Sequence, residues 1–448
     1  MLGRNATHVN TTHINQIPID PKHINRATLV ASLMLLVLLA LTSAATARST
    51  HVQSDNWIGT WSAAPQPFMP AALVTFRNQT VRLIAHASVG GGSVRLRLSN
   101  TYGRGPVSIG AAKIALSGVG ADVKPGSGAI VTFRGSRAVT IPAGATITSD
   151  PVVLTVPRFS DLAVSLFLPR ATPAMTSHFL AMQSGYVSSV AGDQTGATHF
   201  KVGKTIHSWP FLTGIDVTAS DATGAMVVFG DSTVDGDGST EDANHRWPDE
   251  IARAVNDGAG GKDIAVLNEG IIGNRLLHGS PSDPPTQFGD ALGESGIARF
   301  ERDALSSPVT KWVIVRIGIN DLGLPGSMAP ASDAVTAARI IDGYRTLIRK
   351  AHQHGVKILG TTLGPFEGAD IAPGYFSSEK EAQRQEVNAW IRAGGGFDGV
   401  VDLDALLKDP QRPSRLLPAF DSGDHLHPND AGNVASAAVV RRQLFKEQ

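Results

Sequence analysis

Hydrophobic and polar residues follow two different patterns, which divide the chain near residue 220. From about Trp57 to Ser220, short apolar runs are separated by Gly, Pro and Ser. The run Ser93–Ser99 alternates apolar and basic residues, so one of its faces is buried and the other meets water. With Thr80–His86 before it and Gly90–Gly92 between, it predicts an antiparallel hairpin. Many short strands without a helical period predict a β-sandwich or jelly-roll-like region.

Beyond Asp221 the apolar runs are continuous, which is typical of parallel strands covered on both faces. Five runs follow this pattern: Ala225–Phe229, Ile264–Leu267, Trp312–Ile317, Val356–Leu359 and Val400–Leu403. After the third run, apolar residues recur at helical spacing from Ala337 to Ala351, and Gly355 is expected to end that helix. After the fourth, a helix is predicted from Ser378 to near Gly394, with Ser378 and Glu381 as a capping box. This alternation predicts a doubly wound α/β fold.

The first 47 residues have the layout of a secretory signal. Lys22 and Arg26 precede the apolar run Leu29–Leu41, and the small residues Ala45-Thr46-Ala47 follow it. We therefore predict cleavage after Ala47 and a protein that is secreted or held in the cell envelope. The alternative is an uncleaved membrane anchor, because the charged leader is long although the run is shorter than the roughly 20 residues of a span.

The predicted organisation is a signal peptide at 1–47, a β-rich domain at 48–220 and an α/β domain at 221–448. The chain of 448 residues balances 39 Lys plus Arg against 39 Asp plus Glu, which leaves no electrostatic footprint for nucleic acid or anionic membranes. It contains no Cys, which excludes disulfides, thiolate metal ligands and a cysteine nucleophile. Any nucleophilic chemistry must therefore use Ser, His and carboxylates.

Residues capable of such chemistry follow the predicted strands at their carboxyl ends, where doubly wound sheets place their active sites. Three clusters come directly after strands, and the fourth lies in the loop beyond the last strand. They are Gly230-Asp231-Ser232-Thr233, Asn268-Glu269-Gly270-Ile271-Ile272-Gly273-Asn274, Gly318-Ile319-Asn320-Asp321 and Asp424-His425-Leu426-His427-Pro428.

Together the clusters supply the parts of a serine mechanism. A serine hydroxyl needs an imidazole to take its proton, a role open to His427. Asp424, three residues earlier, can orient that imidazole and stabilise its charged form. The N–H groups of Ser232 and Gly273, with the side-chain amide of Asn320, can stabilise an oxyanion.

In order and residue type, the four clusters resemble the signature blocks of the SGNH (GDSL-type) hydrolases. The resemblance implies that Ser232 is the nucleophile and that Asp424 and His427 complete a catalytic triad. It further implies that Ser232, Gly273 and Asn320 form the oxyanion hole. One departure is Thr233, where the eponymous motif has a leucine that takes no part in catalysis.

The resemblance covers about 225–445 and implies a three-layer α/β/α sandwich around a parallel sheet of about five strands. It also implies hydrolysis of carboxylic esters, here short acyl or acetyl esters of small molecules or polysaccharides, through an acyl-enzyme. No cofactor, metal or nucleic acid is implied. The β-rich half, with Trp57-Ile58-Gly59-Thr60-Trp61, resembles the leader of larger bacterial exported members, whose role does not carry over.

Other interpretations of these residues remain open. Asp424, His425, His427 and Asp430 are also possible metal ligands, although His425 is interpreted as a bystander. Asp231 and Asp321 compete with Asp424 for orienting the imidazole, but Asp231 is expected rather to hold its turn by accepting from backbone amides.

Two further stretches have both a structural and a functional interpretation. Asp235-Gly236-Asp237-Gly238 is interpreted as a solvated turn rather than part of a calcium loop. Arg95 and Arg97 are interpreted as the solvated face of a hairpin, the alternative being a carbohydrate-binding face. For the whole chain, the alternative function is a non-catalytic carbohydrate-binding protein on a hydrolase scaffold. Loops Leu276–Gly296 and Gly323–Ser332 are expected to rim the substrate pocket.

Overall fold

The computed structural model describes residues 57–219, 222, 224–257, 263–281, 287–307 and 309–445. The predicted signal peptide, its cleavage site, and the boundaries at 47/48 and 220/221 lie outside the described residues. In the part of the chain that is described, no helix is both long and apolar enough to span a bilayer.

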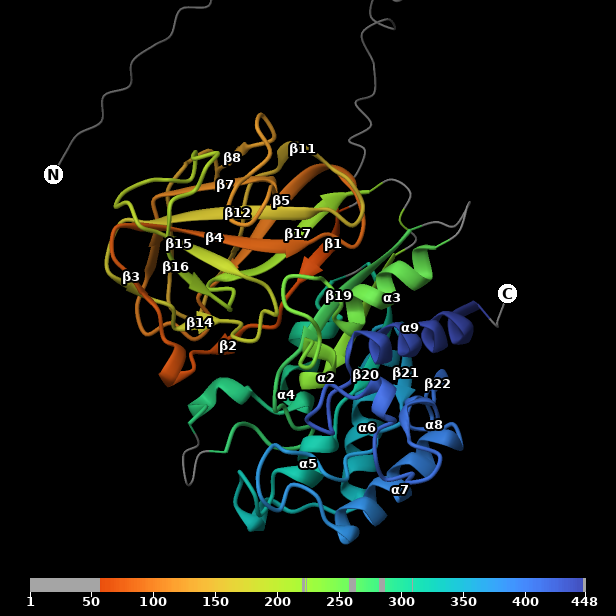
Figure 1. Cartoon of the computed structure of the whole chain (residues 1–448). Coiled ribbons are helices and arrows are strands. Elements are labelled where there is room, and N and C mark those ends of the chain that lie inside the picture. The colour runs from red at the N-terminus through yellow and green to blue at the C-terminus, as the bar shows by residue number, and fades with distance from the viewer. Residues whose placement is uncertain are drawn as a thin grey trace, which may run out of the picture. The chain divides into compact units, whose positions relative to one another are not determined.

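The region before residue 220 is built from two large antiparallel sheets, as the short alternating runs predict (Figure 1). One sheet has the order β1-β17-β5-β10, with β11 also paired to β5, and the other has the order β16-β15-β4-β12-β7-β8. The first comprises β1 (Trp57–Ser62), β5 (Gly91–Ser99), β10 (Thr146–Thr148), β11 (Val152–Val156) and β17 (Leu212–Thr218). The second comprises β4 (Gln79–His86), β7 (Ala111–Leu116), β8 (Ala129–Val131), β12 (Asp161–Leu168), β15 (Gly185–Ser188) and β16 (Val202–Ile206).

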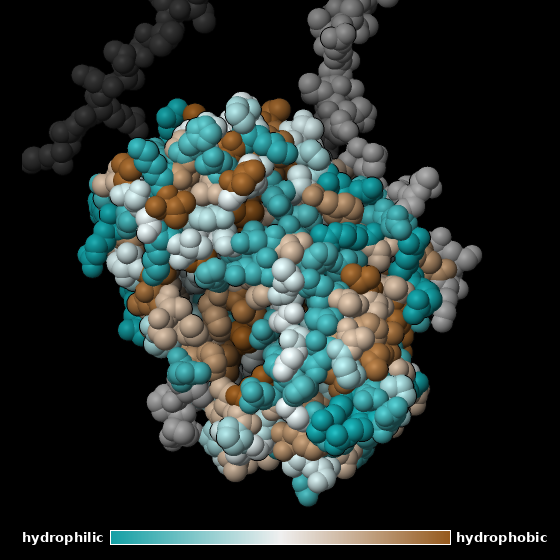
Figure 2. All heavy atoms as spheres, viewed as in Figure 1, coloured by the Kyte–Doolittle hydropathy of each residue, from teal (hydrophilic) through white to brown (hydrophobic). Residues whose placement is uncertain are grey.

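Three two-stranded pairs complete this region: β3 (Thr75–Phe76) with β13 (Thr172–Pro173), β2 (Gln66–Pro67) with β14 (Thr176–Ser177), and β6 (Val107–Ile109) with β9 (Val139–Ile141). Side chains from both large sheets, such as Leu83 and Leu96, belong to one continuous core. On the face shown in Figure 2, hydrophobic residues are scattered among hydrophilic ones over the upper part of the β-rich half, and they gather around a hollow at its lower left border. Val119 and Val153 are exposed, and single exposed apolar side chains are ordinary on protein surfaces.

The predicted hairpin of Thr80–His86 and Ser93–Ser99 is wrong. β4 pairs with β12 and β15, whereas β5 pairs with β17, β10 and β11, so the two strands lie in different sheets. The connecting residues cross between the sheets, since the N–H of Ala87 donates to Ser160 in one direction and that of Ser88 to Thr60 in the other. A glycine-rich link permits a tight hairpin turn and a crossing equally, so its composition does not distinguish them.

The second half forms a parallel five-stranded sheet in the order β19-β18-β20-β21-β22, which confirms the α/β prediction. Its strands are β18 (Gly224–Gly230), β19 (Ile264–Gly270), β20 (Thr310–Arg316), β21 (Lys357–Thr361) and β22 (Gly399–Val401). Each of the first four contains most of one predicted apolar run, and β22 contains only the first half of the run Val400–Leu403, since α8 begins at Leu403. Side chains alternate between faces along β18, with Val227 in the core on one side and Val228 in the core on the other.

Helices cover both faces of this sheet and give the three-layer sandwich (Figure 1). The helices are α2 (Ser232–Asp235), α3 (Trp247–Asn256), α4 (Gly296–Phe300), α5 (Ile319–Gly323), α6 (Ala337–Gln353), α7 (Ser378–Arg392), α8 (Leu403–Leu407) and α9 (Asp430–Phe445). Short 3₁₀-helices occur at Pro70–Ala72, Gly289–Leu292, Ala331–Asp333 and Pro418–Phe420, and a short π-helix occurs at Glu301–Leu305. Residues of α3, α8 and α9 pack on one face, and residues of α4, α6 and α7 pack on the other.

The two predicted helices are present, but one of their caps differs. α6 ends next to Gly355, whose φ of 68° is the left-handed conformation expected after a helix. α7 begins at Ser378 as predicted, yet its cap is Ser377, whose hydroxyl accepts from the N–H of Lys380. Glu381 is therefore one position too late for a capping box, and its carboxylate instead accepts from Arg384.

Candidate active site

The first cluster forms the turn between β18 and the one-turn helix α2, which begins at Ser232. The Asp231 carboxylate caps this helix, accepting from the N–H of Thr233 at 3.1 Å and from its hydroxyl at 2.8 Å. This confirms the interpretation that Asp231 holds the turn. All four residues of α2 are buried, and Ser232 is 3% exposed. The serine hydroxyl is thus fixed at the carboxyl end of the central strands.

The fourth cluster brings an imidazole and a carboxylate to that hydroxyl. His427 Nε2 lies 2.8 Å from Ser232 Oγ, and His427 Nδ1 lies 2.5 Å from Asp424 Oδ2. The other Asp424 oxygen accepts from the N–H groups of Leu426 and His427, both at 2.9 Å. The carboxylate therefore fixes the turn that carries the imidazole as well as the imidazole itself.

Charges around the imidazole set the proton affinities of this pair. Burial lowers the pKa of His427, but the bond to Asp424 and the nearby carboxylates of Asp237, Asp424 and Asp231 more than offset it, so the pKa is raised. Burial raises the pKa of Asp424, yet the bonds from His427 and Leu426 hold it well below its ordinary value. Asp424 is therefore an anion at neutral pH and stabilises the protonated imidazole.

The second and third clusters meet beside this pair. Gly273 has a φ of 67°, and among the described residues neither its N–H nor that of Ser232 donates a hydrogen bond. Asn320 Nδ2 donates to the carbonyl of Asn274 at 3.1 Å, which ties the third cluster to the second. This arrangement leaves the second amide hydrogen of Asn320 for another acceptor.

Tyr375 fixes the Asn320 amide and was not predicted from the sequence. Its hydroxyl donates to Asn320 Oδ1 at 2.8 Å, and its side chain is fully buried. With Oδ1 held by Tyr375 and Nδ2 held by Asn274, the amide has one orientation. The residue lies in an irregular Gly- and Pro-containing stretch before α7, where no periodicity indicates which side chains point inward.

Asp237 is a second carboxylate beside the imidazole that the sequence reasoning did not assign. Its Oδ2 lies 3.7 Å from His427 Nε2, and its side chain is 30% exposed. Burial, opposed by the charge of His427, raises the pKa of Asp237. This carboxylate faces the nitrogen that contacts Ser232, whereas Asp424 faces the opposite nitrogen.

Asp321, the other competing carboxylate, holds the loop after the second cluster instead. Its two oxygens accept from the N–H groups of Leu276 at 2.6 Å and Leu277 at 2.9 Å. Burial raises its pKa to about 7. Asp321 thus shapes the backbone next to Gly273 and Asn274 without a hydrogen bond to His427.

The interpretation of Asp235-Gly236-Asp237-Gly238 as a solvated turn is wrong for its first residue. Asp235 is 1% exposed and bonds to His178 and to the N–H of Ile272. The β-rich half covers this turn, a tertiary contact that turn-forming residue types cannot indicate.

The remaining metal-ligand candidates are engaged elsewhere. His425 Nδ1 lies 2.6 Å from Asp421, and Asp430 accepts from the N–H and hydroxyl of Thr240. In the described ranges no group of three or more His, Asp or Glu side chains is arranged to hold a metal ion. Arg95 and Arg97 both pair with Asp216, so they are half-buried rather than a freely solvated face.

Residues of the two loops expected to rim the substrate pocket share a cavity, but the residues that line it do not include Ser232, Asn320 or His427. The cavity has a volume of about 480 Å³ and is lined by Arg275, residues 278–281, Pro330, Ser332 and Asp333. The Arg275 guanidinium is buried, and it donates to Asp333 at 2.7 Å and to the carbonyl of Gly279. The lining of the cavity is largely polar.

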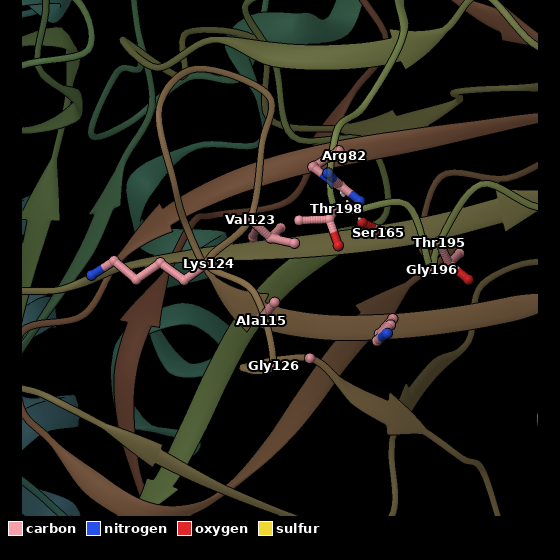
Figure 3. Close-up of a pocket in the computed structure, with 12 residues that line it drawn as sticks. Arg82, Ala115, Val123, Lys124, Gly126, Ser165, Thr195, Gly196 and Thr198 are labelled. Carbon is pink, nitrogen blue, oxygen red and sulfur yellow. Dashed lines mark hydrogen bonds between the residues drawn. The ribbon is translucent and has the colours of Figure 1, made fainter.

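A smaller cavity of about 90 Å³ lies in the β-rich half, around Arg82 (Figure 3). The guanidinium donates to Ser165 Oγ at 2.8 Å, to Ala121 O at 2.7 Å and to Ala197 O at 2.8 Å, and it stacks over Phe200. Burial lowers its pKa to about 10, so it stays charged at neutral pH. Its bonds tie two loops to the sheet, which is a structural role.

Comparison with known proteins relates the second half of the chain to a known family. Residues 228–435 match the family model described as GDSL-like Lipase/Acylhydrolase family. No curated protein matches the chain.

Solved structures similar to this chain include a mutant of Axe2, an acetyl-xylooligosaccharide esterase from Geobacillus stearothermophilus, at 20% identity and a TM-score of 0.37, covering 50% of this chain and 95% of that one. The native aryl esterase of M. smegmatis matches at 18% identity and 0.38, covering 50% and 99%. A GDSL-like lipase from Bacteroides thetaiotaomicron VPI-5482 matches at 14% identity and 0.34, covering 50% and 90%.

Proposed function

We propose, from the premise that this chain carries a GDSL-like lipase/acylhydrolase domain at 228–435 and is a carboxylic ester hydrolase, that it cleaves short acyl or acetyl esters through an acyl-enzyme on Ser232. The observation that carries the proposal is the unbroken hydrogen-bonded series from Asp424 through His427 to Ser232. Nucleophile, base and orienting acid are each within bonding distance of the next, as serine hydrolysis requires.

In the proposed mechanism, Ser232 Oγ attacks the ester carbonyl while His427 Nε2 accepts its proton. Asp424 stabilises the imidazolium that forms, which a carboxylate with a lowered pKa does well. His427 then returns the proton to the leaving alcohol, and the acyl group remains on Ser232. Water attacks the acyl-enzyme by the same route, with His427 again as the base.

The negative charge on the carbonyl oxygen needs donors in place before the reaction. The N–H groups of Ser232 and Gly273 and the Nδ2 of Asn320 are the proposed donors. Because Tyr375 and Asn274 fix the Asn320 amide, its donor would need no reorganisation in the transition state.

The two loops expected to rim the substrate pocket carry polar side chains suited to a small, hydrated substrate. His278 and Ser332, on the cavity between those loops, can bond hydroxyl groups, whereas a long acyl chain would gain little from them. We therefore propose acetyl or short acyl esters, including those of carbohydrates. Export of the protein is part of the proposal and rests on the layout of residues 1–47 alone.

Ser232→Ala tests the proposal directly. Its kcat on p-nitrophenyl acetate is expected to fall by about 10⁶, the loss typical of a removed triad nucleophile, at an unchanged melting temperature. A series of p-nitrophenyl esters of increasing chain length, with acetylated polysaccharides, defines the substrate. Retention of a tenth of the activity would show that Ser232 is not the nucleophile.

The alternative, a non-catalytic carbohydrate-binding protein, has a different signature. A binding protein shows no turnover to lose, and its affinity for an acetylated oligosaccharide is indifferent to Ser232→Ala. Calorimetric titration of wild type and variant with that ligand separates the two functions.

A further inference from the structure

His178 reaches from the β-rich half into the base of the candidate active site. It follows β14, and its ring is 3% exposed. Nδ1 lies 2.9 Å from the carbonyl oxygen of Ala64, and Nε2 lies 2.7 Å from Asp235 Oδ1. Asp235 belongs to α2, three residues after Ser232. The ring therefore connects the first half of the chain to the helix that carries the serine.

The partners of His178 determine its charge. A carbonyl oxygen can only accept, so the bond to Ala64 places a proton on Nδ1, and a carboxylate at Nε2 calls for a second. Burial lowers the pKa of His178, but Asp235, the bond to Ala64 and the more distant Glu269 raise it further than burial lowers it. Trp209 packs against the ring, with Arg246 stacked on Trp209. The acceptors on both sides of the ring therefore predict a buried imidazolium–carboxylate pair of His178 and Asp235.

The other oxygen of Asp235 holds the second cluster. Oδ2 accepts from the N–H of Ile272 at 2.8 Å, and Ile272 immediately precedes Gly273. The backbone of Asp235 approaches Gly270 so closely that a Cβ there would lie 2.2 Å from the Asp235 nitrogen. Asn268 Nδ2 donates to the Asp235 carbonyl as well. One side chain therefore links the serine helix to the backbone beside Gly273.

The β-rich half also holds the loop that follows α2. Asp242 accepts from the side chain of Gln183 at 2.7 Å and from the Ser184 hydroxyl at 2.7 Å. Asn244 donates to Asp161 at 3.1 Å. The segment from α2 to α3 is thus fixed to the first half at several points. Among those between described residues, the His178 contact is the one that continues to the second cluster, through Asp235.

We propose that His178 and Asp235 are positioning residues that set the Gly273 N–H relative to Ser232, so that the β-rich half completes the active site. The proposal rests on the proposed function, in which Ser232 is the nucleophile and Gly273 an oxyanion donor. Neither His178 nor Asp235 touches the reacting atoms. They act through the N–H of Ile272.

Asp235→Ala removes the acceptor for Ile272 and leaves His178 without its carboxylate. Loss of one oxyanion donor costs about 10²–10³ in kcat, which sets the ceiling for its displacement. We expect kcat to fall at least tenfold with KM changed by less than about threefold, because the donor acts mainly in the transition state. His178→Ala is expected to move kcat in the same direction.

Asp235→Asn is the conservative variant that separates position from charge. Its Oδ1 can still accept from Ile272, and its Nδ2 can donate to the Nε2 of a neutral His178 that keeps its Nδ1 proton on Ala64. Every hydrogen bond persists without an ion pair, so kcat is expected within about threefold of wild type. His199→Ala is the matched control, since it removes an exposed histidine–carboxylate pair with Asp122 in the same half.

Nitrogen-15 NMR of the histidine rings gives a readout besides activity. Wild type is expected to show protons on both ring nitrogens of His178 at neutral pH, and Asp235→Asn only the proton on Nδ1. A neutral His178 ring in wild type would overturn the ion pair.

The kinetic results decide the positioning role. A folded Asp235→Ala with wild-type kcat, a loss confined to KM, or an Asp235→Asn as impaired as Asp235→Ala would each overturn it. If Asp235→Ala does not fold, Asp235→Asn and His178→Gln, both able to keep bonds at this site, carry the comparison. Activity retained by Ser232→Ala would instead overturn the proposed function, so the two failures are distinguishable.

Discussion

Removing the Tyr375 hydroxyl tests whether a fixed Asn320 amide matters for turnover. Tyr375→Phe keeps the buried ring and deletes only the 2.8 Å bond to Asn320 Oδ1. The bond from Nδ2 to Asn274 O remains and opposes rotation of the amide, since a flip would set two carbonyl oxygens against each other. The variant therefore loosens the proposed oxyanion donor without removing it.

The magnitude follows from the value of one neutral hydrogen bond. Such a bond contributes about 0.5–1.5 kcal/mol, and each 1.36 kcal/mol is a factor of ten in rate. If the whole loss falls on the transition state, kcat drops by about 2- to 13-fold. Asn320→Ala removes the donor itself and is expected to lower kcat by about 10²–10³, or 2.7–4 kcal/mol. The loss of kcat should therefore be larger for Asn320→Ala than for Tyr375→Phe.

Tyr344→Phe is the matched control for the effect on stability. Tyr344 is also buried and donates to a carbonyl, that of Ile317 at 2.6 Å, but it makes no bond to Asn320. Both phenylalanine variants are expected to lower the melting temperature, because each leaves a buried acceptor unpaired. Only Tyr375→Phe should lower kcat. Equal kcat values for the two variants, or an Asn320→Ala effect confined to KM, would refute the reasoning.

Two further expectations concern the carboxylates near the imidazole. Asp424→Asn should lower kcat by up to about 10⁴, as expected for a triad acid made neutral, whereas Asp231→Asn should chiefly lower the melting temperature. The opposite ranking would show that the orienting acid is misassigned. Because His427 must be neutral to act as a base and its pKa is raised, kcat/KM should rise with pH through a midpoint above the ordinary value of about 6.5. Asp237→Asn removes a negative charge 3.7 Å from Nε2, so the midpoint should move to lower pH. A pH profile unchanged by that substitution would exclude the influence of Asp237.

The sequence predicted what depends on periodicity and chain order. Continuous apolar runs identified the five parallel strands, and the rule that their carboxyl ends carry the chemistry placed Ser232 and Asn320 correctly in the fold. Asp424 and His427 could be paired because three residues separate them, a distance that one turn spans. The bond from His427 to Asp424 follows from that local spacing, whereas the bond from His427 to Ser232 joins residues 195 positions apart and was expected from the strand-end rule and the family resemblance.

What the sequence did not predict depends on contacts between distant segments. His178 lies 57 residues from Asp235, and Tyr375 lies 55 residues from Asn320, so no spacing connects either pair. Asp235 sits among glycines that favour a solvated turn, and only the covering β-rich half makes it buried. The failed hairpin has the same origin, since pairing partners of β4 and β5 are chosen by the core between the sheets rather than by the glycines.

One further consequence follows from β19, the outermost strand of the parallel sheet on the side of the β-rich half. On its outer edge, the N–H of Val266 donates to the Ser88 hydroxyl, and the carbonyl of Asn268 accepts from the Ser62 hydroxyl. Leu267 lies against Gly59 at the same border. In a fragment beginning at Gly224, β19 would stay paired with β18 but its outer edge would be uncovered, and an uncovered apolar strand edge can pair with other chains. We therefore expect the hydrolase domain produced without the first half to aggregate more readily than the whole chain.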